Sequence, residues 1–297
     1  MTSSARPTLD AIARPSGALA MVAMDQRESL RTMFDQAGAG RVPDETMIAF
    51  KLDVARALSP LASGFLIDHV YGVDAAAALL PPSCGLILAA DDLEQEPGGP
   101  VQETGLDQAV VAPDGDLHGA VAIKLLVIWR RDERRAQRVE LAREFIRTAA
   151  ERGVLSVLEP VVRATEAELA AGTWNQEEAI IEAARELSPI GPDLYKVQVP
   201  LGGRAPAAEL ERECARLGEA ITGPWVVLSQ GVQPEDFLGA VRAACRGGAS
   251  GFLAGRALWS DVVGRPDVPA ALAEVSVPRL QRLVDVVDAE ARPWTAA

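Results

Sequence analysis

AVAIKLLVIW, residues 120–129, is the longest apolar run of this chain, and RRAQRVELAREFIRTAAER, residues 134–152, and LSVL, residues 155–158, follow it. The first and third segments are short and apolar, as buried strands are. The middle segment has the apolar spacing of an amphipathic helix. A strand, a helix and a second strand in this order predict a βαβ unit with parallel strands.

The same alternation extends along the whole chain. Apolar runs occur eight times, at residues 18–24, 64–67, 85–90, 120–129, 155–158, 194–199, 225–228 and 251–254. Eight such units in 297 residues predict an α/β fold, a single-domain (β/α)8 TIM barrel over residues 1–297. An open Rossmann-type sheet is disfavoured, because MDQR follows the first run where that fold requires GxGxxG.

Residues 92–118 interrupt this regular alternation. They are polar and rich in Gly, Pro and Asp, and they are too many for an ordinary strand-to-helix connection. We therefore predict a long loop after the third strand, which is either a lid at the carboxyl-terminal ends of the strands or a mobile excursion.

The composition excludes several classes of partner. A net charge of −13 disfavours nucleic acid and anionic membranes as partners. The run 18–24 is too short to span a bilayer, and residues 1–17 lack the pattern of a signal peptide. Cys84, Cys214 and Cys245 are odd in number and widely spaced, which predicts free thiols in a reducing compartment. A cytoplasmic protein is expected.

Lysine is rare in this chain. Of 29 basic residues only Lys51, Lys124 and Lys196 are lysines, and the last two lie inside apolar runs. Compositional bias explains the rarity but not this placement. Unlike arginine, a desolvated lysine can lose its proton and act as a nucleophile, which points to Schiff-base chemistry.

Polar residues that interrupt or end the runs are the candidates for the site, because a barrel builds its active site at the carboxyl-terminal ends of its strands. These residues are Asp25, Gln26, Asp68, Asp91, Lys124, Glu159, Lys196, Ser229 and Arg256. Strand alternation groups Lys124 with Ala122 and Leu126, Glu159 with Val157, and Lys196 with Leu194. The three neighbouring strands should therefore direct Lys124, Glu159 and Lys196 into one cavity.

These three residues suit amine catalysis. A lysine that attacks a ketone must be neutral, and both burial and a second ammonium nearby favour the neutral form. A carboxyl group such as Glu159 can carry protons during formation and dehydration of the carbinolamine. The structural alternative is a buried Lys–Glu pair that does no chemistry.

The last two strands end in a pattern typical of anion binding. Ser229 and Gly231 follow the seventh run, while Gly255 and Arg256 follow the eighth, where barrels often bind phosphate. The chain has only two histidines, His69 and His118, which is few for a catalytic metal site. No metal and no cofactor is predicted.

Several blocks, in this order along the chain, resemble the class I aldolases of the tagatose-1,6-bisphosphate aldolase family. They are SG at residues 16–17, MDQRE at 24–28, KLLVIWR at 124–130, EPVVR at 159–163, DLYKV at 193–197 and GASGFLAGR at 248–256. Within that family they are most similar to the bacterial 6-deoxy-6-sulfofructose-1-phosphate aldolase branch.

The resemblance implies a (β/α)8 barrel with its Schiff-base lysine at Lys196. It places Glu159 as the acid/base residue and Lys124 as the neighbouring amine, with Asp25 on substrate hydroxyls. Gln26, Ser229, Gly255 and Arg256 match positions that hold an anionic end of the substrate. The implied reaction is reversible cleavage of 6-deoxy-6-sulfofructose 1-phosphate to dihydroxyacetone phosphate and sulfolactaldehyde, without a metal.

Two blocks depart from the family pattern. The seventh run ends in SQG at residues 229–231 where Ser-Ser-Gly is expected, and the second ends in DHVYG at 68–72. Cleavage of tagatose 1,6-bisphosphate to glyceraldehyde 3-phosphate therefore stays open, as do a non-catalytic sugar-phosphate-binding barrel and a metal-dependent lyase or isomerase. Self-association is expected, with an apolar stripe at residues 277–289 that packs either on a second copy or on its own barrel.

Overall fold

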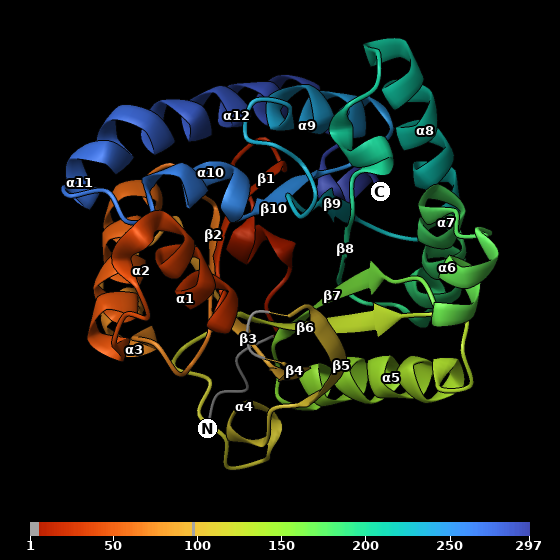
Figure 1. The fold of residues 1–297 in the computed structure, drawn as a ribbon, viewed down its shortest axis with the longest axis horizontal. Coiled ribbons are helices and arrows are strands. Elements are labelled where there is room, and N and C mark those ends of the chain that lie inside the picture. The colour runs from red at the N-terminus through yellow and green to blue at the C-terminus, as the bar shows by residue number, and fades with distance from the viewer. Residues whose placement is uncertain (1–5, 97–98) are drawn as a thin grey trace.

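The computed structural model describes residues 6–96 and 99–297. Eight parallel strands close into a barrel in the order β1-β10-β9-β8-β7-β6-β3-β2 (Figure 1). The strands are β1 (Leu19–Met24), β2 (Gly64–Ile67), β3 (Gly85–Ala89), β6 (Ala122–Trp129), β7 (Leu155–Val162), β8 (Leu194–Val197), β9 (Trp225–Val227) and β10 (Gly251–Ala254). The predicted (β/α)8 fold is confirmed, and each predicted apolar run contains or overlaps one barrel strand.

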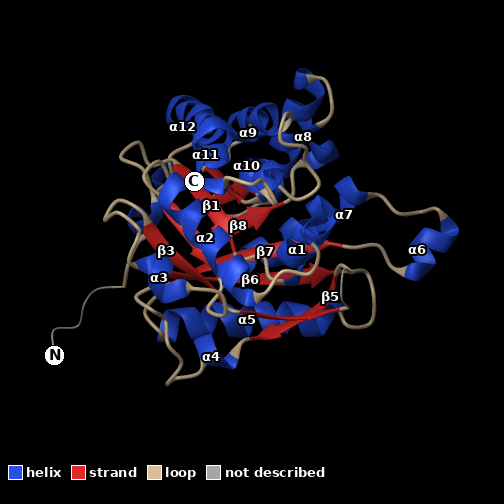
Figure 2. Cartoon of the chain, turned by 60° about the vertical axis from the view of Figure 1, so that its left-hand side comes forward, coloured by secondary structure: helices blue, strands red, loops and turns tan. Residues whose placement is uncertain are grey.

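Helices surround the barrel, as Figure 2 shows. The longer ones are α2 (Asp44–Leu58), α5 (Arg135–Glu151), α7 (Gln176–Leu187), α8 (Ala207–Ala220), α9 (Phe237–Arg246) and α12 (Val277–Glu290). The shorter ones are α1 (Glu28–Phe34), α3 (Val73–Ala77), α4 (Gln108–Val111), α6 (Glu166–Ala171), α10 (Arg256–Trp259) and α11 (Val268–Ala271). None of the helices in the described residues is long and apolar enough to cross a bilayer.

The barrel has two apolar cores, one inside it and one between its strands and the helices. Met21, Leu66 and Ile87 belong to the inner core. The single helical turn Leu9–Ile12 packs two of its side chains against that inner core, and so closes the amino-terminal end of the barrel. The carboxyl-terminal end is left for a site.

Strand alternation directs the candidate side chains inward. Ala122 lies in the inner core while Ile123 and Leu125 lie in the outer one, so Lys124 faces the barrel interior. The same holds around Glu159 and Lys196, because Val157 and Leu194 are in the inner core. The pairing register of β6, β7 and β8 sets Glu159 and Lys196 at one level of the barrel and Lys124 one inward-facing position below them.

Residues 92–118 do not form the predicted long loop. They contain most of an antiparallel hairpin, β4 (Asp91–Gln95) and β5 (Val101–Leu106), followed by α4. Both hairpin strands are polar and mostly half-buried, so no apolar alternation marked them as strands. A backbone hydrogen bond of 3.0 Å from Asp107 N to Ala90 O joins the two ends of the hairpin.

The apolar stripe of α12 packs on its own barrel. Leu280, Leu283 and Val287 are buried in the outer core, where α12 lies against α9. Of the two alternatives for this stripe, the intramolecular one is therefore observed. Self-association stays a prediction without support from this helix.

Candidate active site

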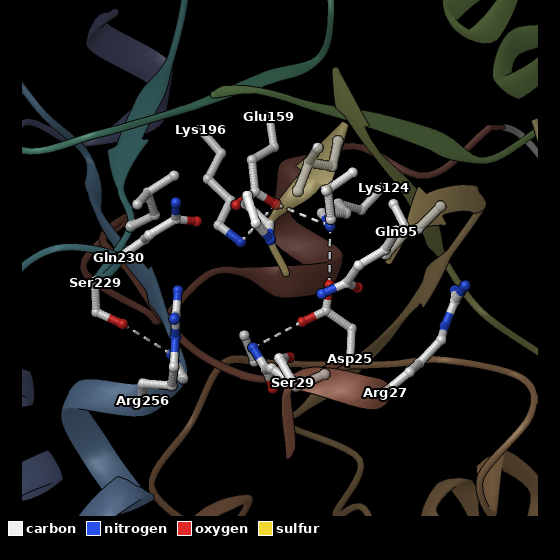
Figure 3. Close-up of a pocket in the computed structure, with 18 of the residues that line it drawn as sticks. Asp25, Arg27, Ser29, Gln95, Lys124, Glu159, Lys196, Ser229, Gln230 and Arg256 are labelled. Carbon is white, nitrogen blue, oxygen red and sulfur yellow. Dashed lines mark hydrogen bonds and ion pairs between the residues drawn. The ribbon is translucent and has the colours of Figure 1, made fainter. Parts of the chain in front are cut away.

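A pocket of about 340 Å³ opens at the carboxyl-terminal ends of the barrel strands. The β4–β5 hairpin forms part of its wall through Leu93, Gln95 and Val101, which places the hairpin where the lid alternative requires. Figure 3 shows the charged and polar side chains around this pocket. Eight predicted site residues line it: Asp25, Gln26, Lys124, Glu159, Lys196, Ser229, Gly255 and Arg256.

Glu159 lies between two lysines at the centre of the pocket. Lys196 Nζ donates a hydrogen bond of 2.9 Å to Glu159 Oε2, and Lys124 Nζ lies 3.0 Å from the same oxygen. All three residues are buried. A single carboxylate oxygen therefore contacts both amines, and it can take a proton from one while the other remains charged.

Lys124 is held as a cation. Its Nζ donates to Asp25 Oδ2 and to Asp91 Oδ2, both at 2.8 Å. Burial alone would lower the pKa of Lys124, but the charges of Asp25, Asp91 and Glu159 outweigh burial and raise the pKa well above its usual value. Lys124 thus supplies a fixed positive charge beside Lys196 and does not have a free lone pair.

Asp25 is held as a carboxylate. Burial acts to raise its pKa, but the ammonium groups of Lys124 and Lys196 outweigh burial and bring the pKa below its usual value. Gln26 Nε2 donates to Asp25 Oδ1 at 3.2 Å, whereas Gln26 Oε1 is buried without a hydrogen-bond partner among the described residues. In this orientation Gln26 offers an acceptor, which suits a substrate hydroxyl better than an anion.

Ser229, Gly255 and Arg256 meet where β9 and β10 end. The backbone N–H of Gly255 donates to Ser229 Oγ at 3.3 Å. A Cβ on Gly255 would lie 2.6 Å from Ala23 O, so only glycine fits there. Burial lowers the pKa of Arg256, and nearby carboxylates offset part of this effect. Gly231, with φ of +83°, lines an adjoining pocket of about 450 Å³ that shares Ser229 and Arg256.

Asp68 does not lie in the pocket where the sequence pattern placed it. Its side chain is fully buried and forms an ion pair with Lys51 of α2, while its Oδ1 accepts hydrogen bonds from the backbone N–H groups of Val70 and Tyr71. Asp68 pairs with a residue of the surrounding helix layer, and its partners all belong to the protein. The prediction that Asp68 contacts the substrate is therefore wrong. Lys51 therefore forms a structural ion pair and does not line the pocket.

Lys51→Met is expected to lower the free energy of unfolding by about 3–5 kcal/mol, because it leaves the Asp68 carboxylate buried without its cation. Both side chains are fully buried, and burial lowers the pKa of Lys51 while the charge of Asp68 opposes that shift. Urea denaturation followed by circular dichroism measures the loss. The double variant Lys51→Met with Asp68→Asn should recover part of it, and a single variant as stable as the wild type would contradict this account.

Three further residues line the pocket or support its side chains, and the sequence marked only one of them, Asp91, as a candidate. Asp91 is the first residue of β4 and holds Lys124, Gln95 comes from the hairpin, and Arg163 follows β7. Asp91 was a candidate because it follows an apolar run, whereas Arg163 appeared only in the block at residues 159–163 and nothing local marked Gln95. Within residues 6–96 and 99–297, no three His, Cys, Asp or Glu side chains are grouped as metal ligands would be.

The chain matches a family model described as DeoC/LacD family aldolase over residues 19–261. Tagatose 1,6-diphosphate aldolase 2 of Enterococcus faecalis is 28% identical over 328 aligned positions, which span 100% of this chain and 97% of that protein. Tagatose 1,6-diphosphate aldolase of Listeria monocytogenes is 28% identical over 278 aligned positions, spanning 85% of this chain and 80% of that one.

Solved aldolase structures share the fold. An archaeal fructose-1,6-bisphosphate aldolase, described with its catalytic Lys bound to the carbinolamine intermediate, has a TM-score of 0.58 at 16% identity and spans 94% of this chain and 98% of its own. Fructose-bisphosphate aldolase of Plasmodium falciparum has a TM-score of 0.65 at 14% identity, spanning 93% and 94%. At these identities the likeness concerns the fold.

Proposed function

Because this chain belongs to the DeoC/LacD family of aldolases and is a class I aldolase, we propose that it reversibly cleaves a ketose 1-phosphate through a Schiff base on Lys196. The products are dihydroxyacetone phosphate and a three-carbon aldehyde. The observation that carries this proposal is the contact of Lys196 with Glu159 beside the charged Lys124. An amine, a proton carrier and a fixed cation are the groups that imine formation requires.

Proton transfer from Lys196 to Glu159 across their 2.9 Å contact frees the amine, which attacks the C2 carbonyl of the ketose. Glu159 returns the proton as the carbinolamine loses water, leaving an iminium ion. The C3–C4 bond then breaks as Glu159 accepts the proton of the C4 hydroxyl, which releases the aldehyde and leaves an enamine on Lys196. Protonation and hydrolysis of that intermediate release dihydroxyacetone phosphate.

The remaining lining residues orient the substrate in this proposal. Asp25, held as a carboxylate, accepts hydrogen bonds from substrate hydroxyls, and Lys124 fixes its position. The phosphate on C1 binds where Ser229, Gly255 and Arg256 meet, since the Ser229 hydroxyl, which accepts from the Gly255 N–H and so can donate its own proton, and a guanidinium suit a tetrahedral oxyanion.

For the ketose itself we propose 6-deoxy-6-sulfofructose 1-phosphate, which yields sulfolactaldehyde. The similarity of several sequence blocks to that branch of aldolases supports this choice. The second candidate is tagatose 1,6-bisphosphate, which yields glyceraldehyde 3-phosphate, and the names of the Enterococcus and Listeria relatives support it. Both ketoses carry phosphate on C1 and end in a second tetrahedral oxyanion group, so they place the same demands on Lys196.

A retro-aldol assay with 6-deoxy-6-sulfofructose 1-phosphate, tagatose 1,6-bisphosphate and fructose 1,6-bisphosphate tests this proposal. We expect dihydroxyacetone phosphate from the first at a kcat/KM at least about tenfold above the other two. The highest kcat/KM with tagatose 1,6-bisphosphate would establish the second candidate instead. No dihydroxyacetone phosphate from any of the three would contradict the proposed reaction.

A further inference from the structure

Among the described residues, two arginines of the active-site pocket have no ion-pair partner. Arg27, Arg163 and Arg256 all line the pocket, and Arg27 pairs with Asp91. Neither Arg163 nor Arg256 forms an ion pair with any carboxylate of residues 6–96 and 99–297. A guanidinium that faces a pocket without a counterion is costly in the empty protein, so a ligand that brings the missing negative charge gains affinity.

Arg163 is the less expected of the two. It follows the last residue of β7, and its backbone N–H donates to Trp129 O at 2.9 Å, so the strand pairing extends through it. It lies four residues beyond Glu159 and therefore on the same, inward face of the strand. Four residues correspond to about 13 Å along a strand, so the Arg163 backbone stands above the two lysines at the mouth of the pocket.

The surroundings of Arg163 leave its charge unbalanced. Its Nε is buried and has no hydrogen-bond partner among the described residues. Burial lowers its pKa, and the neighbouring charges of Arg130 and Arg256 lower it further. Arg130 itself is bound by Gln102 of the hairpin, with Glu103 at 3.7 Å. An anion is therefore favoured at Arg163 and a cation is excluded.

The strand order tells which part of the ketose Arg163 meets. Around the barrel, β10 with Arg256 is followed by β9, by β8 with Lys196, and by β7 with Glu159 and Arg163. The nucleophile therefore lies between the guanidinium groups of Arg256 and Arg163. The ketose is joined to Lys196 through C2. If its C1 phosphate points towards Arg256, then C3 to C6 point towards β7.

On this basis, which rests on the proposed function, we propose that Arg163 binds the anionic group at the far end of the aldehyde half. Arg256 binds the C1 phosphate, which becomes the phosphate of dihydroxyacetone phosphate. Arg163 binds the sulfonate or phosphate on C6, which leaves as part of the aldehyde. The site then selects ketoses with a negative group at both ends. Arg163 is a specificity residue in this assignment and takes no part in proton transfer.

The synthetic direction tests this assignment most directly. Dihydroxyacetone phosphate is condensed with glyceraldehyde 3-phosphate, with sulfolactaldehyde, or with neutral glyceraldehyde, and the preference for a charged aldehyde is the ratio of kcat/KM values. Arg163→Gln should reduce that preference about 10- to 100-fold, because a hydrogen-bonded charge pair is lost. Arg163→Lys should reduce it less, because it keeps the charge without the planar donor fork.

Two controls make the result specific. Arg130→Gln removes a charge from the same mouth without touching the pocket, and it should change the preference less than about threefold. Borohydride trapping of dihydroxyacetone phosphate on Lys196 should be unchanged in Arg163→Gln and weakened in Arg256→Gln. Because Arg163→Gln removes repulsion with Arg130 and Arg256, we expect it to melt no lower than the wild type.

Three outcomes overturn different statements. An unchanged preference in Arg163→Gln, with an active wild-type protein, overturns the assignment of Arg163. If trapping of dihydroxyacetone phosphate is weakened in Arg163→Gln as much as in Arg256→Gln, both arginines bind the same anion. That result also overturns the assignment of Arg163. A wild-type protein that traps nothing on Lys196 overturns the proposed function itself.

Discussion

Lys196→Met is expected to lower kcat by at least about 10⁴-fold while the protein still folds, because no other lysine can take over imine formation. The chain has three lysines. Lys51 is fully buried against Asp68, and Lys124 is surrounded by three carboxylates that keep it protonated. The measurement is steady-state cleavage of the preferred ketose, with mass spectrometry of the protein after borohydride reduction.

Lys196→Arg is the matched control for charge. It keeps a cation next to Glu159, but a guanidinium does not form an imine, so kcat should fall as far as in the methionine variant. With dihydroxyacetone phosphate and borohydride, the wild type should gain a stable mass on the peptide that carries Lys196. A modified Lys124 peptide, or substantial turnover in either variant, would reassign the nucleophile.

Glu159→Gln should lower kcat by about 10²–10⁴-fold, because the amide keeps the size of the side chain but cannot carry a proton between Lys196 and the substrate. The effect should appear in kcat more than in the binding of dihydroxyacetone phosphate. Single-turnover trapping with borohydride measures imine formation separately from cleavage, and we expect both steps to slow.

Glu159→Asp is the companion variant. It restores a carboxylate that is one methylene shorter, so its kcat should lie between those of the wild type and the glutamine variant. Equal kcat values for the wild type and Glu159→Gln would contradict the proton-carrier role. They would leave Glu159 as a structural partner of Lys124 and Lys196, and thermal melting would then show the loss instead.

The barrel was predictable because its signals are local and repeated. Buried parallel strands are apolar on both faces, so each run stands out against the helical pattern around it. The β7 run was predicted to end at residue 158, yet the strand continues to Val162, because Glu159 and Pro160 interrupt the apolar pattern while the backbone stays extended. The β4–β5 hairpin was missed because its strands are polar and depend on pairing with each other.

The site was predictable to the extent that strand alternation decides where a side chain points. Lys124, Glu159 and Lys196 converge because each has the inward parity of its strand. Asp68 follows β2 as Asp25 follows β1, and only the tertiary position of Lys51 in α2 turns Asp68 away from the pocket. The missing counterions of Arg163 and Arg256 could not be predicted either, because a lack of partners is a property of the folded neighbourhood.

The hydrogen bond between Asp107 N and Ala90 O makes the hairpin a replaceable module of the scaffold. Its two ends leave the barrel at one point, so segments of other lengths can be grafted there with little change in loop-closure entropy. Asp91 must stay, because it positions Lys124, whereas Leu93, Gln95 and Val101 form part of the pocket wall. Evolution, or a designer, can therefore change the range of accepted aldehydes by exchanging this segment while the imine-forming residues remain untouched.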